Sequence, residues 1–220
     1  MRRFFARGAT LLTVLWLCGC STASLFDSET PPPTNYVLAS LPAANAARPS
    51  RASNVDVAIA RPDAGPGLDS RRIAVLRGRL LDYYRGTEWG GSVPEVVQTL
   101  LVSSLDGQQL FRSVTSEQTR VSTEYLLDVE VRDFQSEYVG SSANPSVHVT
   151  IICHLIRVAD RELVATLSST ALQAADDNKM GAVAAAFEAA AQQVALDLAG
   201  KTATTIAADQ EKLTTREKRQ

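Results

Sequence analysis

The sequence predicts an α+β fold, in which a mostly antiparallel sheet carries two helices packed on one face. In residues 127–132, 147–156 and 163–167, every second side chain is apolar, beginning with the first residue of each segment. This alternation is typical of strands that bury one face. Residues 180–198 instead repeat apolar side chains every three or four positions, as an amphipathic helix does. Sheet and helix patterns of this kind in one chain favour an α+β architecture.

Short strands are expected in the first half of the domain. Residues 36–38 and 55–60 are strand candidates. Residues 72–76 and 79–84 flank Arg77-Gly78, and this spacing predicts a β-hairpin, although Arg-Gly is a weaker turn signal than Asn-Gly. A further short strand is expected at 111–114, before the three longer ones.

Two helices are expected. Ser92 and Glu95 have the spacing of a capping box, with Pro94 early in the helix, so a helix should begin here and end near Gly107. The second helix follows the third long strand and should stop at Gly200. Its apolar face comprises Met180, Val183, Phe187, Ala190, Val194 and Leu198.

The first nineteen residues have the parts of a bacterial signal peptide. Arg2, Arg3 and Arg7 precede the apolar stretch 9–17, which is shorter than the roughly 20 apolar residues needed to cross a bilayer. The stretch leads into Leu17-Cys18-Gly19-Cys20, which resembles the lipobox of bacterial lipoproteins. We expect cleavage before Cys20, with diacylglycerol and an N-acyl lipid on that cysteine. A signal peptide with a chance cysteine and an uncleaved anchor are the alternatives.

A tether is expected to follow the anchor, over residues 20–35. Pro31, Pro32 and Pro33 favour an extended backbone, which could hold the domain about 45 Å from the membrane. By resemblance to Gram-negative lipoproteins, Ser21 behind the cysteine permits export to the outer membrane. The expected location is therefore the inner leaflet of the outer membrane, with the domain in the periplasm.

The domain itself is expected to span residues 36–200. A second loose stretch, 42–53, is rich in Ala, Pro and Arg. Residues 201–220 have mixed charge and are expected to form a disordered tail.

Composition limits the function classes. Without the signal peptide, about 200 residues remain, with 19 basic and 24 acidic side chains and a net charge near −5. This charge argues against a nucleic-acid partner, which would need a basic face. With Cys20 lipidated, Cys153 cannot form an internal disulfide, and its apolar strand pattern indicates a small buried residue rather than a reactive thiol.

No catalytic pattern is present in the sequence. His148 and His154 lie six residues apart on one predicted strand, roughly 20 Å along it, so they cannot bind one metal ion by themselves. The sequence contains no Gly-x-Ser-x-Gly elbow and no phosphate-binding loop. We therefore expect a protein that is not an enzyme and that uses neither a metal nor a cofactor.

An aromatic cluster precedes the first helix. It consists of Tyr83, Tyr84 and Trp89. Trp89 could pack over the start of the helix as part of the core. Alternatively, the cluster could face a partner or lipid, because large aromatic side chains anchor interfaces when they are exposed.

The order of these features resembles the ABC-type transport auxiliary lipoproteins, the PqiC-like proteins of Gram-negative bacteria, over residues 36–200. The resemblance rests on the lipobox, Tyr36-x-Leu38, Leu68-Asp69-Ser70, Ile73-Ala74-Val75, Leu81-x-Tyr83, Glu88-Trp89, Pro94, Phe111-x-x-Val114, Phe187 and Leu198. Each piece is short and common alone, so the specificity lies in their order and spacing. The 42–53 stretch and the charged tail depart from the family pattern.

The resemblance implies a non-catalytic accessory or docking subunit of a phospholipid transport system. Its partners would be an MCE-domain protein, which forms a conduit across the periplasm, and the inner-membrane ABC ATPase and permease. Members of the family self-associate into rings, so the resemblance also allows a homo-oligomer. A lipoprotein regulator of an envelope enzyme, such as a cell-wall synthase, is the alternative of a different class, and an envelope hydrolase is a third.

Overall fold

The computed structural model describes residues 31–40, 53–138, 140 and 142–219. The described strands are β1 (Thr34–Tyr36), β2 (Ser53–Ile59), β3 (Asp63–Ala64), β4 (Arg72–Arg77), β5 (Leu80–Trp89), β6 (Phe111–Ser116), β7 (Tyr125–Glu137), β8 (Ser146–Arg157) and β9 (Glu162–Ala174). The helices in these ranges are α2 (Val93–Gly107), α3 (Met180–Glu217) and the short 3-10 helix η2 (Glu117–Thr119). The predicted α+β class is confirmed. The expected signal peptide, Cys20 and most of the 42–53 stretch lie outside the described residues.

Strand β7 is the centre of a mixed sheet of nine strands. One of its edges pairs antiparallel with β8, which in turn pairs antiparallel with β9. The other edge pairs with β2, β3 and β4, which follow one another along it in parallel orientation. Strand β6 continues the sheet from β2, and β5 and then β1 continue it from β4. The longest ladders are therefore antiparallel, and the parallel ladders are short.

The predicted hairpin is present as β4 and β5. Arg77 pairs with Leu80, so the two-residue turn is Gly78-Arg79 and not Arg77-Gly78. Gly78 has a φ of 63°, which glycine adopts at little cost. Strand β5 runs on to Trp89, where it pairs in parallel with β1. Strand β1 ends at Tyr36, so the strand expected at 36–38 is shifted along the chain.

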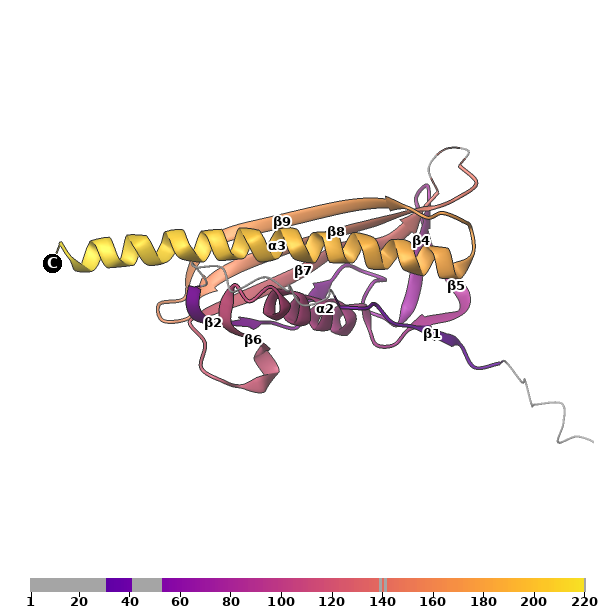
Figure 1. The fold of residues 1–220 in the computed structure, drawn as a ribbon. Helices are drawn as coiled ribbons and strands as arrows, with labels where there is room; N and C mark the ends of the chain where they lie inside the picture. The colour runs from indigo at the N-terminus through magenta and orange to yellow at the C-terminus, as the bar shows by residue number, and fades with distance from the viewer. Residues whose placement is uncertain (1–30, 41–52, 139, 141, 220) are drawn as a thin grey trace, which may run out of the picture. The chain divides into compact units, whose positions relative to one another are not determined.

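Both α-helices lie on the same face of the sheet, as predicted (Figure 1). Helix α2 contacts β2 and β6, helix α3 contacts β8 and β9, and the two helices also contact each other. Helix α2 ends at Gly107, the residue predicted from the sequence. The Ser92 N–H donates a hydrogen bond to the Glu95 carboxylate at 2.9 Å, which supplies the predicted partner for an unpaired amide at the helix start.

Three aromatic rings from different elements meet in the core. Trp89 at the end of β5 lies 5.7 Å from Phe134 of β7 and 5.1 Å from Phe187 of α3, between ring centroids. All three side chains are fully buried. Phe134 reaches this position because the ladder between β7 and β8 shifts register between Val131 and Asp133. A bulge of this kind changes which residues of a strand face the core.

Helix α3 does not stop at Gly200, and this prediction was wrong. The helix continues to Glu217, so residues 201–217 are ordered helix rather than the expected disordered tail. Gly200 costs about 1 kcal/mol relative to alanine inside a helix. Burial of Ile206 and Asp209 beyond it offsets that cost.

Asp209 joins the C-terminal half of α3 to the sheet. Its carboxylate accepts hydrogen bonds from the Arg157 guanidinium at 2.7 and 3.0 Å and from the Tyr125 hydroxyl at 2.8 Å. The side chains of Arg157 and Asp209 are 9% and 7% exposed. The Arg157 hydrogen bonds hold the pKa of Asp209 below its ordinary value. Burial and the bond to Asp209 raise the pKa of Tyr125 to about 12.

Substitution of Asp209 by asparagine should destabilise the fold. We expect Asp209→Asn to lower the free energy of unfolding by about 3 kcal/mol at neutral pH, since it removes one partner of a buried ion pair. Asp197→Asn is the matched control, because Asp197 is an exposed carboxylate on the same helix, paired with Lys201. It should cost less than about 1 kcal/mol. Urea denaturation measures both values.

The stability deficit of Asp209→Asn should also depend on pH. The folded-state pKa of Asp209 is lowered from 3.8, so the ion pair stabilises the wild type above that value and is lost as the pH falls through the folded-state pKa. The deficit should therefore shrink in acid. Small and equal losses in both variants at neutral pH would contradict this role of Asp209.

Candidate functional site: an apolar pocket between β1 and α2

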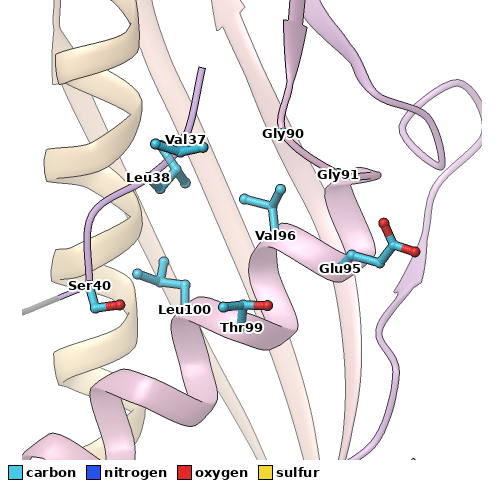
Figure 2. Close-up of a pocket in the computed structure, with 9 residues that line it drawn as sticks. All are labelled: Val37, Leu38, Ser40, Gly90, Gly91, Glu95, Val96, Thr99 and Leu100. Atoms are coloured by element: carbon cyan, nitrogen blue, oxygen red, sulfur yellow. The ribbon is translucent and has the colours of Figure 1, made fainter. Parts of the chain in front are cut away.

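A pocket of about 370 Å³ opens between the segment after β1 and helix α2. Figure 2 shows Val37 and Leu38 on one side of it and Val96 and Leu100 on the other. The complete lining is Val37, Leu38, Ser40, Gly90, Gly91, Glu95, Val96, Thr99 and Leu100. Leu100 is 2% exposed and Val37 is 75% exposed. The pocket therefore extends from an exposed apolar rim down to the core.

Two sets of backbone hydrogen bonds hold the β1 side of the pocket. The Gly90 N–H donates to the Tyr36 carbonyl oxygen at 2.7 Å. On helix α3, the Glu188 carboxylate accepts from the Ala39 N–H at 2.8 Å, and the Gln192 amide donates to the Ala39 carbonyl oxygen at 2.8 Å. Because both backbone groups of Ala39 are bonded, the Val37–Ser40 wall is fixed to the helix.

A glycine allows this wall to approach the start of α2. A Cβ atom built on Gly90 would lie 3.0 Å from Cγ1 of Val37. This separation is shorter than an ordinary van der Waals contact, which is about 3.5–4.0 Å between carbon atoms. A larger residue at position 90 would push Val37 outward and change the shape of the pocket.

Glu95 is the one titratable residue of the lining. The hydrogen bond from the Ser92 backbone N–H keeps the pKa of Glu95 below its ordinary value. Its carboxylate already serves the helix start, and Figure 2 shows it at the edge of the pocket next to Gly91. Apolar walls with a few polar groups at the rim suit an apolar side chain or an acyl segment.

The structure separates the predicted aromatic cluster into one fully buried residue and two half-buried ones. Trp89 is fully buried, as in the core alternative, and its indole N–H has no hydrogen-bond partner among the described residues. The Tyr83 hydroxyl donates to the Gly67 carbonyl oxygen at 2.8 Å. The hydroxyls of Tyr84 and Ser136 are 2.9 Å apart. Tyr83 and Tyr84 are half-buried, and neither lines the pocket.

The histidines lie on the sheet face opposite the helices and belong to no metal site among the described residues. His148 Nδ1 is 3.2 Å from a Glu137 oxygen, and His154 Nδ1 is 3.0 Å from the Thr166 hydroxyl.

Cys153 is 1% exposed, and burial raises the pKa of its thiol to about 12, so it is a core residue. Neither helix of the described ranges combines the length and the apolar character that a membrane crossing requires.

The chain and its fold match known proteins. The model of a family described as ABC-type transport auxiliary lipoprotein component matches residues 36–199. The chain belongs to this family. Its family description makes it a lipoprotein of the cell envelope and an auxiliary component that associates with an ABC transporter.

Solved structures agree with this assignment. The crystal structure of a Xanthomonas campestris protein of family DUF330 is 27% identical, with a TM-score of 0.73, and the match covers 81% of this chain and 99% of that one. A second, uncharacterized protein is 10% identical, with a TM-score of 0.59 and coverage of 78% and 99%, and this likeness shows the fold. Comparison with curated proteins gives no match.

The pocket of this transport auxiliary lipoprotein was not predicted from its sequence. One signal was available, because Val96 lies beside the buried stripe of α2 and widens its apolar face. The opposite wall depends on the pairing of β1 with β5, which joins residues more than 50 positions apart. No local pattern indicates that pairing.

Filling the pocket should block the binding of an apolar ligand. We expect Thr99→Trp to weaken binding of the neutral dye phenylnaphthylamine about tenfold, which corresponds to about 1.4 kcal/mol. Asp106→Trp is the matched control, since Asp106 is exposed on α2 and does not line the pocket. Fluorescence titration measures both affinities. Equal affinities in the two variants would place the dye elsewhere.

Proposed function

We propose that this protein is a non-catalytic docking subunit of an MCE-type phospholipid transport system, anchored to the outer membrane through Cys20. The match to the transport auxiliary lipoprotein family over residues 36–199 carries the proposal. In such a system the MCE-domain protein spans the periplasm from an inner-membrane ATPase and permease. The anchored domain would hold the far end of that conduit close to the outer membrane.

The apolar pocket supports a docking role. An exposed apolar residue at the rim and a buried leucine at the base can take up an apolar side chain of a partner, and buried anchors of this kind provide most of the affinity of an interface. Val37 lies only four residues after Pro33. A partner bound in the pocket would therefore lie close to the tether that leads to Cys20.

The anchor supports the proposal from the sequence side. The basic front, the apolar stretch of 9–17 and the lipobox before Cys20 all suit a lipoprotein signal. A cysteine that carries several acyl chains holds a protein on a membrane far more firmly than one myristoyl chain does. A subunit that must receive lipid at one membrane requires such a fixed position.

Removal of the lipidated cysteine should abolish function by releasing the domain. We expect the Cys20→Ala protein to be absent from the membrane fraction. Cells that carry it should show the same increase in envelope permeability as cells in which the gene is deleted. Cys153→Ala is the control, because it removes the buried thiol and retains the anchor. Cell fractionation and an antibiotic-uptake assay measure the two effects. Normal complementation by Cys20→Ala protein would contradict the anchored docking role.

A crosslinker placed in the pocket should capture the MCE-domain protein. A photo-reactive amino acid at Val37 should do so in intact cells. The same group at Leu172, an exposed apolar residue of β9 outside the pocket, should not. Mass spectrometry of the adducts identifies the partner. Capture of a cell-wall synthase in place of an MCE-domain protein would favour a regulator of an envelope enzyme.

A further inference from the structure

The β4–β5 hairpin concentrates positive charge in an acidic protein. Residues 71–89 contain five arginines and two acidic residues. The rest of the chain after the predicted signal peptide has 14 basic and 22 acidic residues. Glu88 pairs with Arg71 at 3.4 Å, which leaves four arginines against the single carboxylate of Asp82. Positive charge therefore dominates the exposed part of the hairpin.

Two of the arginines line a recess of about 230 Å³, which we call the arginine-lined recess. Its complete lining is Pro33, Arg72, Tyr83, Tyr84, Arg85, Gly86, Thr87 and Glu88. The carboxylate of Glu88 is paired with Arg71. The Arg72 guanidinium stacks 3.5 Å above the centre of the Tyr83 ring. Arg85 has no ion pair within the ranges that the structure describes. Guanidinium groups placed in this way can bind a phosphate through two parallel hydrogen bonds.

The tip of the hairpin combines charge with an exposed apolar side chain. Arg77, Gly78, Arg79 and Leu80 are all exposed, and Leu80 is 64% exposed. Arg77 lies 4.8 Å from the centre of the Tyr138 ring, and Arg79 forms no ion pair with another described residue. Leu80 follows Arg79 in the chain and pairs with Arg77 across the hairpin. An exposed apolar side chain beside basic ones can enter the headgroup layer of a membrane.

The hairpin lies beside the point where the chain enters the domain. Thr34 pairs with Thr87 of β5, and Pro33 contributes to the arginine-lined recess. Figure 1 shows β4, β5 and β1 at one end of the sheet and the C-terminal end of α3 at the other. Thirteen residues separate Cys20 from Thr34, and this segment can span at most about 50 Å.

We propose that the β4–β5 hairpin binds anionic phospholipid headgroups of the membrane that holds the anchor. This inference rests on the proposed attachment through Cys20. The short tether keeps the hairpin at a high effective concentration near that membrane. Each arginine close to an anionic surface increases partitioning several-fold. The exposed Leu80 favours a lipid surface over an acidic protein, because it can enter the apolar layer beneath the headgroups.

Vesicle binding of the unlipidated chain tests the proposal. The protein is the chain from residue 20 onward with Cys20→Ala, so that any binding comes from the domain and not from the anchor. Sedimentation is measured with vesicles of phosphatidylethanolamine and phosphatidylglycerol and with vesicles of phosphatidylcholine alone. We expect binding to the anionic vesicles only, with a decrease as salt concentration rises.

Charge reversal locates the binding surface. Arg79→Glu with Arg85→Glu should reduce partitioning to anionic vesicles at least about tenfold. Arg216→Glu with Lys218→Glu is the matched control, because it changes the net charge equally on exposed residues at the far end of α3. The control should lose much less. Circular dichroism of both variants checks that the fold is retained.

Three results would overturn the proposal. These are equal losses in the two charge-reversal variants, equal binding to neutral vesicles, and no binding of the wild-type chain to anionic vesicles. If the wild-type chain does not bind anionic vesicles, the in-cell crosslink from Val37 is repeated in the Arg79→Glu, Arg85→Glu variant. Loss of that crosslink would show that the hairpin binds an acidic protein partner instead. Failure of the anchoring proposal would show in a different experiment, as normal complementation by the Cys20→Ala protein, which does not depend on the vesicle assay.

Discussion

Packing of Trp89 against Phe134 and Phe187 sets the geometry of both proposed surfaces. The three ring centroids lie 5.1–5.7 Å apart, and each ring comes from a different element. Trp89 is followed by Gly90, whose N–H bonds the end of β1, and Phe187 is followed by Glu188, whose carboxylate bonds Ala39. We therefore expect loss of the cluster to weaken both attachments of the pocket wall. It would also release the end of β5 that pairs with β1.

The short strand β1 separates two surfaces of different chemistry. Its first residue, Thr34, lies beside the arginine-lined recess, and the chain after its last residue, Tyr36, forms the apolar wall of the pocket. A charged surface can remain hydrated in contact with headgroups, whereas an apolar pocket gains free energy when it excludes water. In our two proposals these surfaces act at the same time, one on the membrane and one on a partner.

Much of the fold was predictable, because its main signals are local. The alternation in 127–132 and 147–156 and the capping pattern at Ser92 correctly identified strands β7 and β8 and the start of α2. Phe134 was missed, because the bulge after Val131 interrupts the alternation. The end of α3 was placed at Gly200 for a related reason. Glycine is a local signal for the end of a helix, whereas Ile206 and Asp209 are buried by contacts with distant parts of the chain that keep the helix going. In both cases, tertiary packing outweighed the local preference.

The sequence by itself determined the types and order of the main elements and the resemblance to the transport auxiliary lipoproteins, because periodicity, capping and motif spacing are properties of neighbouring residues. Only the tertiary structure decided where the candidate site lies. The pocket requires β1, the start of α2 and the middle of α3 to meet. The arginine-lined recess requires Pro33 to lie beside Arg72 and Arg85. These contacts join residues far apart in the chain, and they form only because one shared core must exclude water from all the elements at once.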